Sequence, residues 1–442
     1  MSGCPRRPGP ILAVDLGSST FKAMLFDPDL APRGAGEADL RYLPAGEGRV
    51  EIAVRDAEEA FRSGVAEALS NAGMKASEVA AVALTSQAQT FTVRSPDGGA
   101  RLPFISWRDE RCAGRNPAAG LPDFAAHCSV HECLPLLAVS KLAFLQAESN
   151  RGLVRGRDLV LMLPTWFVVR LTGRAVLDRN LAAMSGLYSM VHEGWWYQAL
   201  RACSIGRKNL PAVVELGAVA GRTVDSAADF GLPPGLPVIA AGNDQTAGAC
   251  GARLQREGAV LVTLGTAQVA YAVCDELPPP AAGTMRGPYP GGRFYRLAAD
   301  TCGAGTVNWA RGRLRECASP EALDRAAGDA PEDCGGVCFV ADGPAGSGRW
   351  LGGSAATTSG EKARAVFTCL AERLANMLAM LGPQAADRKL LVAGGGSRST
   401  TWLECIRRRL GRPLQRTEFA SPCLGAARLA RAATGRNPGS GS

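Results

Sequence analysis

The chain has 442 residues, which is too many for a single hydrophobic core of ordinary size, so we expect two domains. Apolar residues make up 46% and charged residues 20% of it, the proportions of a soluble globular protein. The net charge of +8 is scattered, and its densest cluster, RRRLGR from Arg407, is typical of a solvated helix end. This pattern argues against a nucleic-acid-binding surface, and the basic excess would suit an anionic substrate such as a nucleotide.

Neither secretion nor membrane attachment is indicated. The opening segment MSGCPRRPGP lacks an apolar core, and no run of about 18 apolar residues could span a bilayer. The fourteen cysteines are dispersed among apolar runs and form no CxxC pair. We therefore expect a cytoplasmic protein.

One histidine pair has a spacing that a metal site could use. His127 and His131 stand four residues apart, with Cys128 and Cys133 nearby, which would place both rings on one helix face. No second pair of ligands and no carboxylate-rich segment accompanies them. A partly buried helix is the preferred interpretation, and no metal is assigned there.

The first predicted element is the stretch ILAVDLGSSTFKAMLF, which begins at Ile11. An apolar strand runs into Asp15, turns through Gly17, Ser18 and Ser19, and resumes as a second apolar strand. A helix follows from residue 56 to residue 72, with an acidic first turn and a glycine after its last residue. Strand-like runs such as AVALTSQAQTFTV and LPVIAAG alternate with amphipathic stretches, which favours an α/β architecture.

The plan of the first stretch recurs beyond residue 248 in GAVLVTLGTAQVAYAV, again an apolar strand, Leu-Gly, a hydroxyl and a second apolar strand. One copy alone is equally compatible with an ordinary β-hairpin. Two copies favour two related halves, in each of which a glycine lets backbone N–H groups approach an anion. We expect domains at 11–247 and 248–432, followed by a disordered Gly/Ser-rich tail at 433–442.

A third glycine cluster lies in LLVAGGGSRSTTW, between a strand from Leu390 and a helix that starts near Ser399. Bare backbone at such a crossing can meet a flat or anionic ligand. The chain lacks both the GxGxxG and the GxxxxGK[ST] pattern, so nucleotide binding through either of those folds is disfavoured.

Taken in order, these pieces resemble the FGGY carbohydrate kinases, whose two ribonuclease-H-like halves, related to the actin and sugar-kinase ATPases, close on ATP at a central cleft. The resemblance covers nearly the whole chain. Its motifs are DLGSST, TSQAQT, ISWRDERC, VSKLAFL, LDRNLAAMSGLY, AGNDQTAGACGA, TLGTA, GAGTVNWA and AGGGSRSTTWL. The region around GPAGSGRWLGGSAATTSGEKARAVF only loosely follows the second family signature, and the chain is shorter than typical members.

The resemblance implies the cofactors ATP and Mg²⁺. Asp15 would help to place the magnesium ion that bridges the phosphates. The residues implied to contact ATP are Gly17, Ser18, Ser19, Gly265, Thr266, Asn308, Gly395 and Gly396. Each could instead be a plain turn residue.

Asp244 is the implied catalytic base, which would accept the proton of the sugar hydroxyl. Gly242 and Gly248 flank a predicted helix N-terminus there, where the dipole and free N–H groups keep a carboxylate ionised. The alternative is an N-cap aspartate with no role in catalysis.

Sugar recognition needs converging polar groups beside an apolar wall, and one short span offers them. Besides Asp244, the expected sugar-binding residues are Gln87, Gln89, Trp107, Asp109 and Arg111. In the alternative, Trp107 belongs to the core, and Asp109 with Arg111 forms a surface ion pair. Xylulokinase-like members commonly have histidine where Gln89 stands.

The sequence therefore predicts an ATP-dependent kinase that phosphorylates a hydroxyl of a small ketose or polyol. A pentulose such as xylulose is preferred and sedoheptulose comes next. The expected partners are this substrate and ATP, with no nucleic acid and no membrane, and a homodimer is left open. The competing hypothesis is a non-catalytic nucleotide switch on the actin-like fold.

Overall fold

The computed structural model describes residues 9–435, apart from residues 45, 47, 150–151, 255–257, 344–345 and 419. The chain divides into two compact units. Unit 1 is built from the described residues of Met1–Gly251, Gly287–Phe294 and Ser421–Ser442, and unit 2 from those of Ala252–Arg286 and Tyr295–Ala420.

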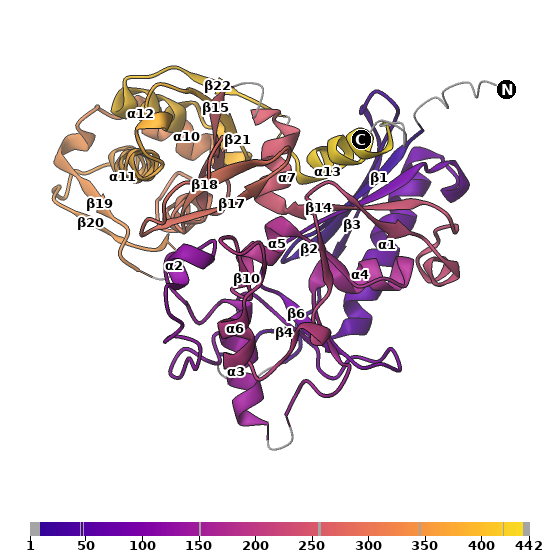
Figure 1. Ribbon diagram of the computed structural model, residues 1–442. Coiled ribbons are helices and arrows are strands. Elements are labelled where there is room, and N and C mark those ends of the chain that lie inside the picture. Colours follow the sequence, from indigo (N-terminus) through magenta and orange to yellow (C-terminus); the bar gives the residue numbers. More distant parts are fainter. Residues whose placement is uncertain are drawn as a thin grey trace. The chain divides into compact units, whose positions relative to one another are not determined.

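The main sheet of unit 1 has the strand order β13-β14-β5-β1-β2-β3 (Figure 1). β1 pairs antiparallel with β2 and parallel with β5, which in turn pairs parallel with β14. The strands are β1 (Ile11–Leu16), β2 (Thr20–Phe26), β3 (Pro32–Asp39), β5 (Ala81–Ser86), β13 (Val219–Arg222) and β14 (Pro237–Asn243).

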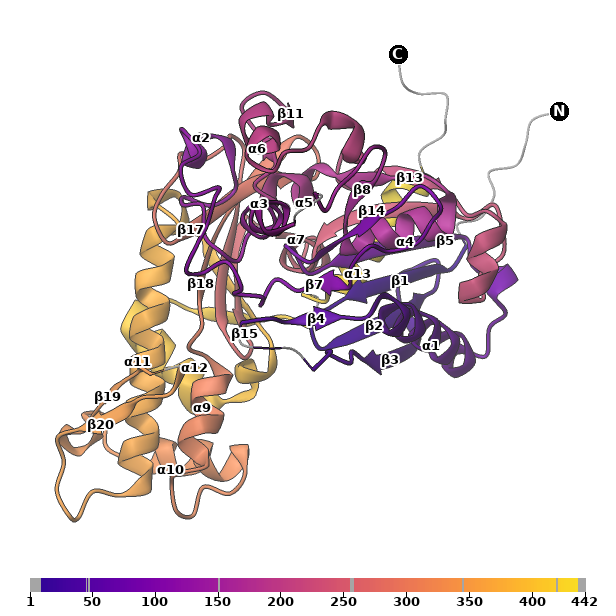
Figure 2. The ribbon, with the colours of Figure 1, turned by 90° about the horizontal axis from the view of Figure 1, so that it is seen from below.

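Helices cover both faces of this sheet because its central strands are apolar on both sides. Leu12 and Val14 of β1 join the cluster beneath α1 (Val54–Ala72), while Ile11 and Ala13 join the cluster beneath α13 (Pro422–Thr434). Figure 2 shows α1 lying against β2 and β3. α1 ends as predicted, since Gly73 caps it with a left-handed φ of 62°.

Unit 2 repeats this plan, with the strand order β17-β18-β16-β15-β21-β22. β15 pairs antiparallel with β16 and parallel with β21, as β1 does with β2 and β5. The strands are β15 (Ala259–Leu264), β16 (Gln268–Cys274), β17 (Thr284–Tyr289), β18 (Arg293–Asp300), β21 (Lys389–Ala393) and β22 (Leu414–Arg416). The end of β17 and the start of β18 fall in the segment Gly287–Phe294, which belongs to unit 1. The predicted duplication is confirmed, because the two hairpins occupy equivalent places in their sheets.

The helices of unit 2 pack beside its sheet. α11, the long helix in Figure 2, contacts both α10 and α12. The helices are α9 (Ala304–Arg311), α10 (Pro320–Asp329), α11 (Ser359–Met380) and α12 (Thr400–Leu410). Arg407 lies in the last turn of α12, as the sequence predicted, and its neighbours Arg408 and Arg409 form ion pairs with glutamates.

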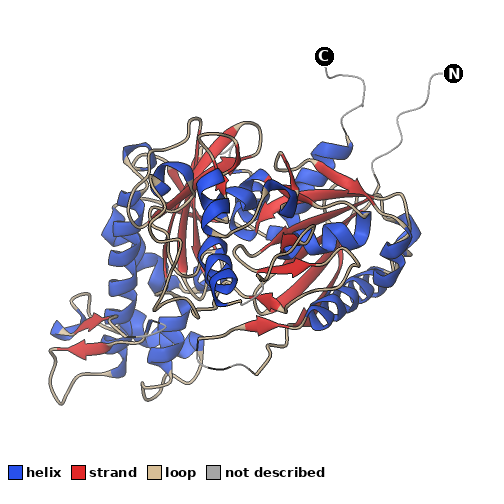
Figure 3. Ribbon diagram, turned by 60° about the horizontal axis from the view of Figure 1, so that its bottom comes forward, coloured by secondary structure: helices blue, strands red, loops and turns tan. Residues whose placement is uncertain are grey.

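The remaining elements of unit 1 form smaller layers beside the main sheet, and Figure 3 distinguishes their strands from their helices. A second sheet has the order β4-β7-β6-β8, and two short ladders join β9 with β12 and β10 with β11. The strands are β4 (Glu51–Ile52), β6 (Phe91–Arg94), β7 (Phe104–Ile105), β8 (Leu159–Met162), β9 (Val176–Asp178), β10 (Tyr188–Ser189), β11 (Gly194–Trp195) and β12 (Ala212–Val214). The helices are α2 (Phe124–His127), α3 (Ala138–Glu148), α4 (Leu163–Thr172), α5 (Arg179–Met184) and α6 (Tyr197–Ala202); in unit 2, β19 (Cys338–Val340) pairs with β20 (Arg349–Leu351).

The predicted domain boundaries differ from the observed units. The boundary between residues 247 and 248 falls inside α7 (Asp244–Gly251), so Gly248 is a helical residue rather than a flanking one. α13 belongs to unit 1 and includes residues 433 and 434 of the expected tail, while residues 436–442 lie outside the described part. Gly425 of α13 packs so closely on α7 that a Cβ there would lie 1.7 Å from the Ala247 carbonyl oxygen.

Two other local expectations are corrected. The run AVALTSQAQTFTV is not one strand. Its first part is β5, which ends at Ser86, and its last part is β6, which belongs to the second sheet. Gln89, between the two strands, adopts a left-handed φ of +67°. α2 ends at His127, so His127 and His131 do not lie on the same helix. Within the described residues, no helix is long and apolar enough to cross a bilayer.

Candidate active site

Asp15 and Asp244 come together at one edge of the main sheet of unit 1. Asp15 lies near the end of β1, and Asp244 follows directly on β14 as the first residue of α7. Because β1, β5 and β14 are parallel neighbours, their carboxyl ends share one edge. The carboxylate of Asp244 is close enough to influence the ionisation of Asp15.

The protein environment disfavours negative charge on this pair. Burial raises the pKa of Asp15 above its usual value, and the charge of Asp244 raises it further. Burial also raises the pKa of Asp244, against hydrogen bonds from Gln245 and Asn243 that favour its ionised form. Oδ1 of Asp15 is buried and has no hydrogen-bond partner.

These features suit a hard divalent cation. Mg²⁺ prefers oxygen ligands and commonly takes only one or two protein carboxylates, completing its shell with water and phosphate oxygens. The described residues contain no cluster of three or more histidine, cysteine or acidic side chains, so no all-protein metal cage is present there. The pair fits a magnesium ion that arrives with a nucleotide.

The junction from β14 to α7 is positioned by Gly242, as the sequence indicated, and by Asn180, to which the sequence assigned no role. Gly242 has a φ of +74°, and a Cβ there would lie 2.6 Å from Leu216, so only glycine fits this turn. Oδ1 of Asn180 accepts a hydrogen bond from the Asn243 N–H at 3.0 Å. Asn180 also donates to Thr246 Oγ1 and to the Pro288 carbonyl oxygen. Asn180 occurs in the motif LDRNLAAMSGLY, but only the fold reveals its partners.

Two expected sugar-binding residues use their amide groups inside the protein. Gln87 donates from Nε2 to the Gly17 carbonyl oxygen at 3.0 Å, and its Oε1 accepts from Thr90. Gln89 donates from Nε2 to the Met184 carbonyl oxygen, and its Oε1 accepts from the Ala138 N–H at 2.8 Å. Both side chains are nearly buried, so they position backbone segments in this structure rather than offering free groups to a sugar.

Lys141 of α3 reinforces the same region. Its ammonium group is fully buried and donates to the carbonyl oxygens of Gln89, at 3.1 Å, and Ser106, at 2.6 Å. Burial lowers the pKa of Lys141 to about 7. The resemblance included this lysine in VSKLAFL, but sequence reasoning gave it no task.

Asp109 and Arg111 form an ion pair, but not at the surface. Arg111 Nε and Nη2 each lie 2.7 Å from an oxygen of Asp109, whose carboxylate also accepts from the Val50 N–H. Glu51 completes this buried network. Trp107 is 38% exposed, which excludes the alternative that it belongs to the core.

Three loops of unit 2 converge around the turn after β15. The Gly265 carbonyl oxygen accepts from the Ala304 N–H at 2.8 Å, and the Thr266 carbonyl oxygen accepts from the Gly305 N–H, so the turn packs on the start of α9. A Cβ on Gly394 would lie 2.6 Å from the Leu264 carbonyl oxygen. This close packing brings the third glycine cluster to the end of the same strand.

The expected ATP-binding residues of unit 2 lie on or next to these loops. Thr266 and Asn308 are exposed, the latter on α9. A Cβ on Gly395 would meet no atom within 4 Å, so its backbone is open to a ligand. In unit 1, Ser19 is exposed and Ser18 half-buried in the turn between β1 and β2.

Comparison with known proteins agrees with this geometry. Residues 10–251 match the N-terminal domain of the FGGY family of carbohydrate kinases. The chain is 30% identical to a glycerol kinase of Trichlorobacter lovleyi over 96% of this chain and 90% of that protein, and 29% identical to a xylulose kinase of Streptomyces coelicolor over 92% and 84%. A solved xylulose kinase from Brucella ovis has a TM-score of 0.86 at 25% identity, covering 97% of this chain and 91% of that one.

The chain belongs to the FGGY family of carbohydrate kinases. It is therefore an ATP-dependent carbohydrate kinase, and this assignment favours the enzyme over the non-catalytic nucleotide switch. Its relatives include both xylulose and glycerol kinases at similar identity, so the family assignment leaves the sugar unspecified.

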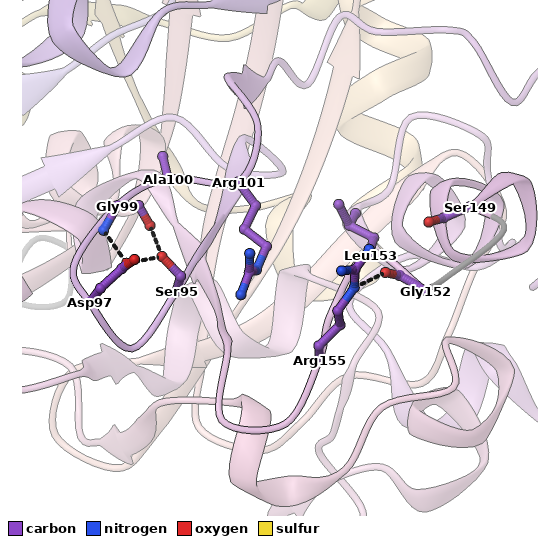
Figure 4. Close-up of a pocket in the computed structure, with 9 residues that line it drawn as sticks. All are labelled: Ser95, Asp97, Gly99, Ala100, Arg101, Ser149, Gly152, Leu153 and Arg155. Atoms are coloured by element: carbon purple, nitrogen blue, oxygen red, sulfur yellow. Dashed lines mark hydrogen bonds between the residues drawn. The ribbon is translucent and has the colours of Figure 1, made fainter.

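This FGGY kinase also has a cavity of about 430 Å³ that contains none of the expected site residues. Figure 4 shows the residues that line it, which are Ser95, Asp97 and Gly99–Arg101 on one side and Ser149, Gly152, Leu153 and Arg155 on the other. Arg101 on its wall is held by Asp158 at 2.5 Å, and Arg155 donates from Nε to the Gly152 carbonyl oxygen. Neither Asp15 nor Asp244 lines this cavity.

A first prediction concerns Gln89. Gln89→Ala leaves the Met184 carbonyl oxygen and the Ala138 N–H buried without partners, at a cost of about 1–3 kcal/mol each. We expect a lower free energy of unfolding by urea denaturation, whereas the control Gln198→Ala, at an exposed position of α6, should change little. Unaltered stability with a raised KM for sugar would instead make Gln89 a direct sugar ligand.

Proposed function

We propose that this kinase phosphorylates a small ketose or polyol, with a pentulose such as xylulose as the first substrate to test and sedoheptulose as the second. The observation that carries the chemistry is the half-buried pair Asp15 and Asp244, in which the buried Oδ1 of Asp15 has no hydrogen-bond partner. The pentulose preference rests on the xylulose kinases among the relatives. The same proposal places the enzyme in the cytoplasm.

In this proposal the two carboxylates have different tasks. Asp15, together with Mg²⁺, would neutralise phosphate charge on the nucleotide, which is the chemistry that the ion supplies when bound. Asp244 accepts the proton of the attacking hydroxyl and orients its oxygen towards the phosphorus. Its place at the first turn of α7 favours the ionised form that a base needs, and so opposes the effect of burial, which raises the pKa of Asp244.

We propose that fewer side chains contact the sugar than the sequence suggested. Trp107 offers an exposed indole as the apolar wall on which a sugar ring or chain can lie. Gln87, Gln89, Asp109 and Arg111 instead shape the site by holding its backbone. Recognition of individual hydroxyls therefore depends on backbone groups and on Asp244.

On the nucleotide side, the turns Gly17–Ser19 and Gly265–Thr266 would present backbone N–H groups and hydroxyls to the phosphates. Gly395 and Gly396 would lie against adenosine, and Asn308 would lie near the nucleoside. The open backbone at Gly395 and the exposed side chain of Asn308 support these roles.

Release of ADP over a substrate panel tests the proposal. The panel is D-xylulose, D-ribulose, L-ribulose, sedoheptulose, gluconate and glycerol, and we expect the highest kcat/KM for a pentulose. Replacing Asp244 with asparagine in the same assay controls for contaminating kinases. A preference for glycerol would refute the pentulose assignment but keep the polyol class, and no stimulation by any compound would refute both.

A further inference from the structure

A chain of hydrogen bonds runs from the backbone at Trp107 to the turn between β1 and β2. The Trp107 N–H donates to Thr90 Oγ1 at 3.0 Å, and this hydroxyl donates to Gln87 Oε1 at 3.2 Å. Gln87 Nε2 then donates to the Gly17 carbonyl oxygen at 3.0 Å. Thr90 and Gln87 are buried, so water does not compete for these groups.

Each hydrogen bond in this series has a fixed direction from donor to acceptor. The Thr90 hydroxyl accepts from Trp107 with a lone pair and donates its only proton to Gln87. The Gln87 amide must then present its nitrogen to Gly17, because its oxygen is already facing Thr90. A change at one end therefore alters the partner geometry at the other.

The equivalent turn in unit 2 is held differently. There the carbonyl oxygen of Gly265 accepts from the main-chain N–H of Ala304, within a rigid helix start. In unit 1 the matching Gly17 carbonyl oxygen is held by a side chain. The two turns share one fold position, yet only the Gly17 turn is connected in this way to the Trp107 loop.

We propose that Thr90 and Gln87 are positioning residues that couple sugar occupancy at Trp107 to the geometry of the phosphate-binding turn Gly17–Ser19. The inference rests on the proposed function, which assigns sugar to Trp107 and phosphate to this turn. Sugar that settles against Trp107 fixes its backbone, and the chain transmits this constraint to Gly17. ATP then binds in its productive geometry only when sugar is present.

Thr90→Val is the sharpest test, because valine keeps the shape of threonine but removes both hydrogen bonds. Thr90→Ser restores the hydroxyl and should restore the coupling. Thr92→Val is the matched control: Thr92 is also a buried threonine, and it donates to the Leu102 carbonyl oxygen outside this chain. A second variant, Gln87→Glu, would place a carboxylate oxygen opposite the Gly17 carbonyl oxygen and should break the last link.

Hydrogen–deuterium exchange of the intact protein tests the connection without any sugar. The Trp107 amide bonds Thr90, and the Leu40 amide bonds the Ser19 carbonyl oxygen, so the two amides report on the two ends. In Thr90→Val, exchange at both should be faster by about three- to tenfold, the factor expected for one lost hydrogen bond. Unchanged exchange at Leu40 in Thr90→Val, or equal effects of Thr90→Val and Thr92→Val on these two amides, would overturn the connection.

Ligand coupling tests the consequence. The Kd of a non-hydrolysable ATP analogue is measured with and without the best substrate of the panel, and a ratio of roughly 5–150 is usual for coupled sites. We expect that ratio to approach one in Thr90→Val and to be restored in Thr90→Ser. A wild-type ratio near one, or an unchanged ratio in Thr90→Val, would overturn the proposal. If no panel substrate stimulates ADP release, the proposed function is refuted. The exchange experiment still decides whether Thr90 links the Trp107 backbone to the Gly17–Ser19 turn.

Discussion

Replacing Asp244 with asparagine is expected to lower kcat by about 10²–10⁴-fold, the usual contribution of a general base. Asparagine keeps the size of the side chain and an oxygen that can accept from the Gln245 N–H, but it cannot take up the hydroxyl proton. Phosphoryl transfer leaves the protein mainly positioning and electrostatic work, so nucleotide affinity should change little. Turnover with the best substrate and the Kd of an ATP analogue are measured together.

The control for this variant is Asp56→Asn. Asp56 is also an acidic residue in the first turn of a helix, α1, but it lies outside the proposed site. Asp56→Asn loses the same charge near a helix N-terminus and should lower stability only slightly, whereas Asp244→Asn also relieves the repulsion between Asp244 and Asp15 and should leave the protein at least as stable as wild type. If Asp244→Asn keeps kcat within a fewfold of wild type, Asp244 only begins a helix and the base lies elsewhere.

Replacing Asp15 with alanine is expected to lower kcat by about 10–100-fold and to raise the Mg²⁺ concentration needed for half-maximal activity, as is typical when a group that orients a metal is lost. Asp15 is half-buried near Asp244, and its buried Oδ1 lacks a hydrogen-bond partner among the described residues. The measurement is a magnesium titration of activity at saturating ATP. Full activity at low magnesium would show that the first turn is a structural hairpin.

Thermal stability gives a second readout that does not depend on turnover. Without Mg²⁺, the carboxylates of Asp15 and Asp244 repel one another, so Asp15→Asn should leave the protein at least as stable as wild type. Asp158→Asn is the control, because Asp158 is an aspartate of the same unit whose carboxylate is paired with Arg101. That variant should lower Tm without altering the response to magnesium. A loss of stability in Asp15→Asn would argue that Asp15 has a structural partner.

Some of the site was predictable because its residues act through local backbone geometry. Asp15 and Gly17–Ser19 lie in one hairpin, and Asp244 begins the helix that follows β14, so strand and helix signals place each of them. The sugar-binding set was less predictable. Gln87 and Gln89 are polar and two residues apart, but the chain leaves one sheet for another between them, and the structure uses both amides to secure that crossing.

The sequence by itself determined the duplicated α/β plan, the end of α1 at Gly73, the strand-to-helix crossing at Gly394–Gly396 and the acidic residues at the ends of two strands. These features depend on the period of the hydrophobic residues, on glycine that adopts a left-handed conformation and on the helix dipole, and each of them is set by residues that are close in sequence. Only the tertiary structure decided that α13 returns to unit 1, and that Asn180, Lys141 and Thr90 hold the site. Those interactions join residues tens to hundreds of positions apart. The pairing of polar groups over such separations is fixed by packing in three dimensions, and no local pattern encodes it.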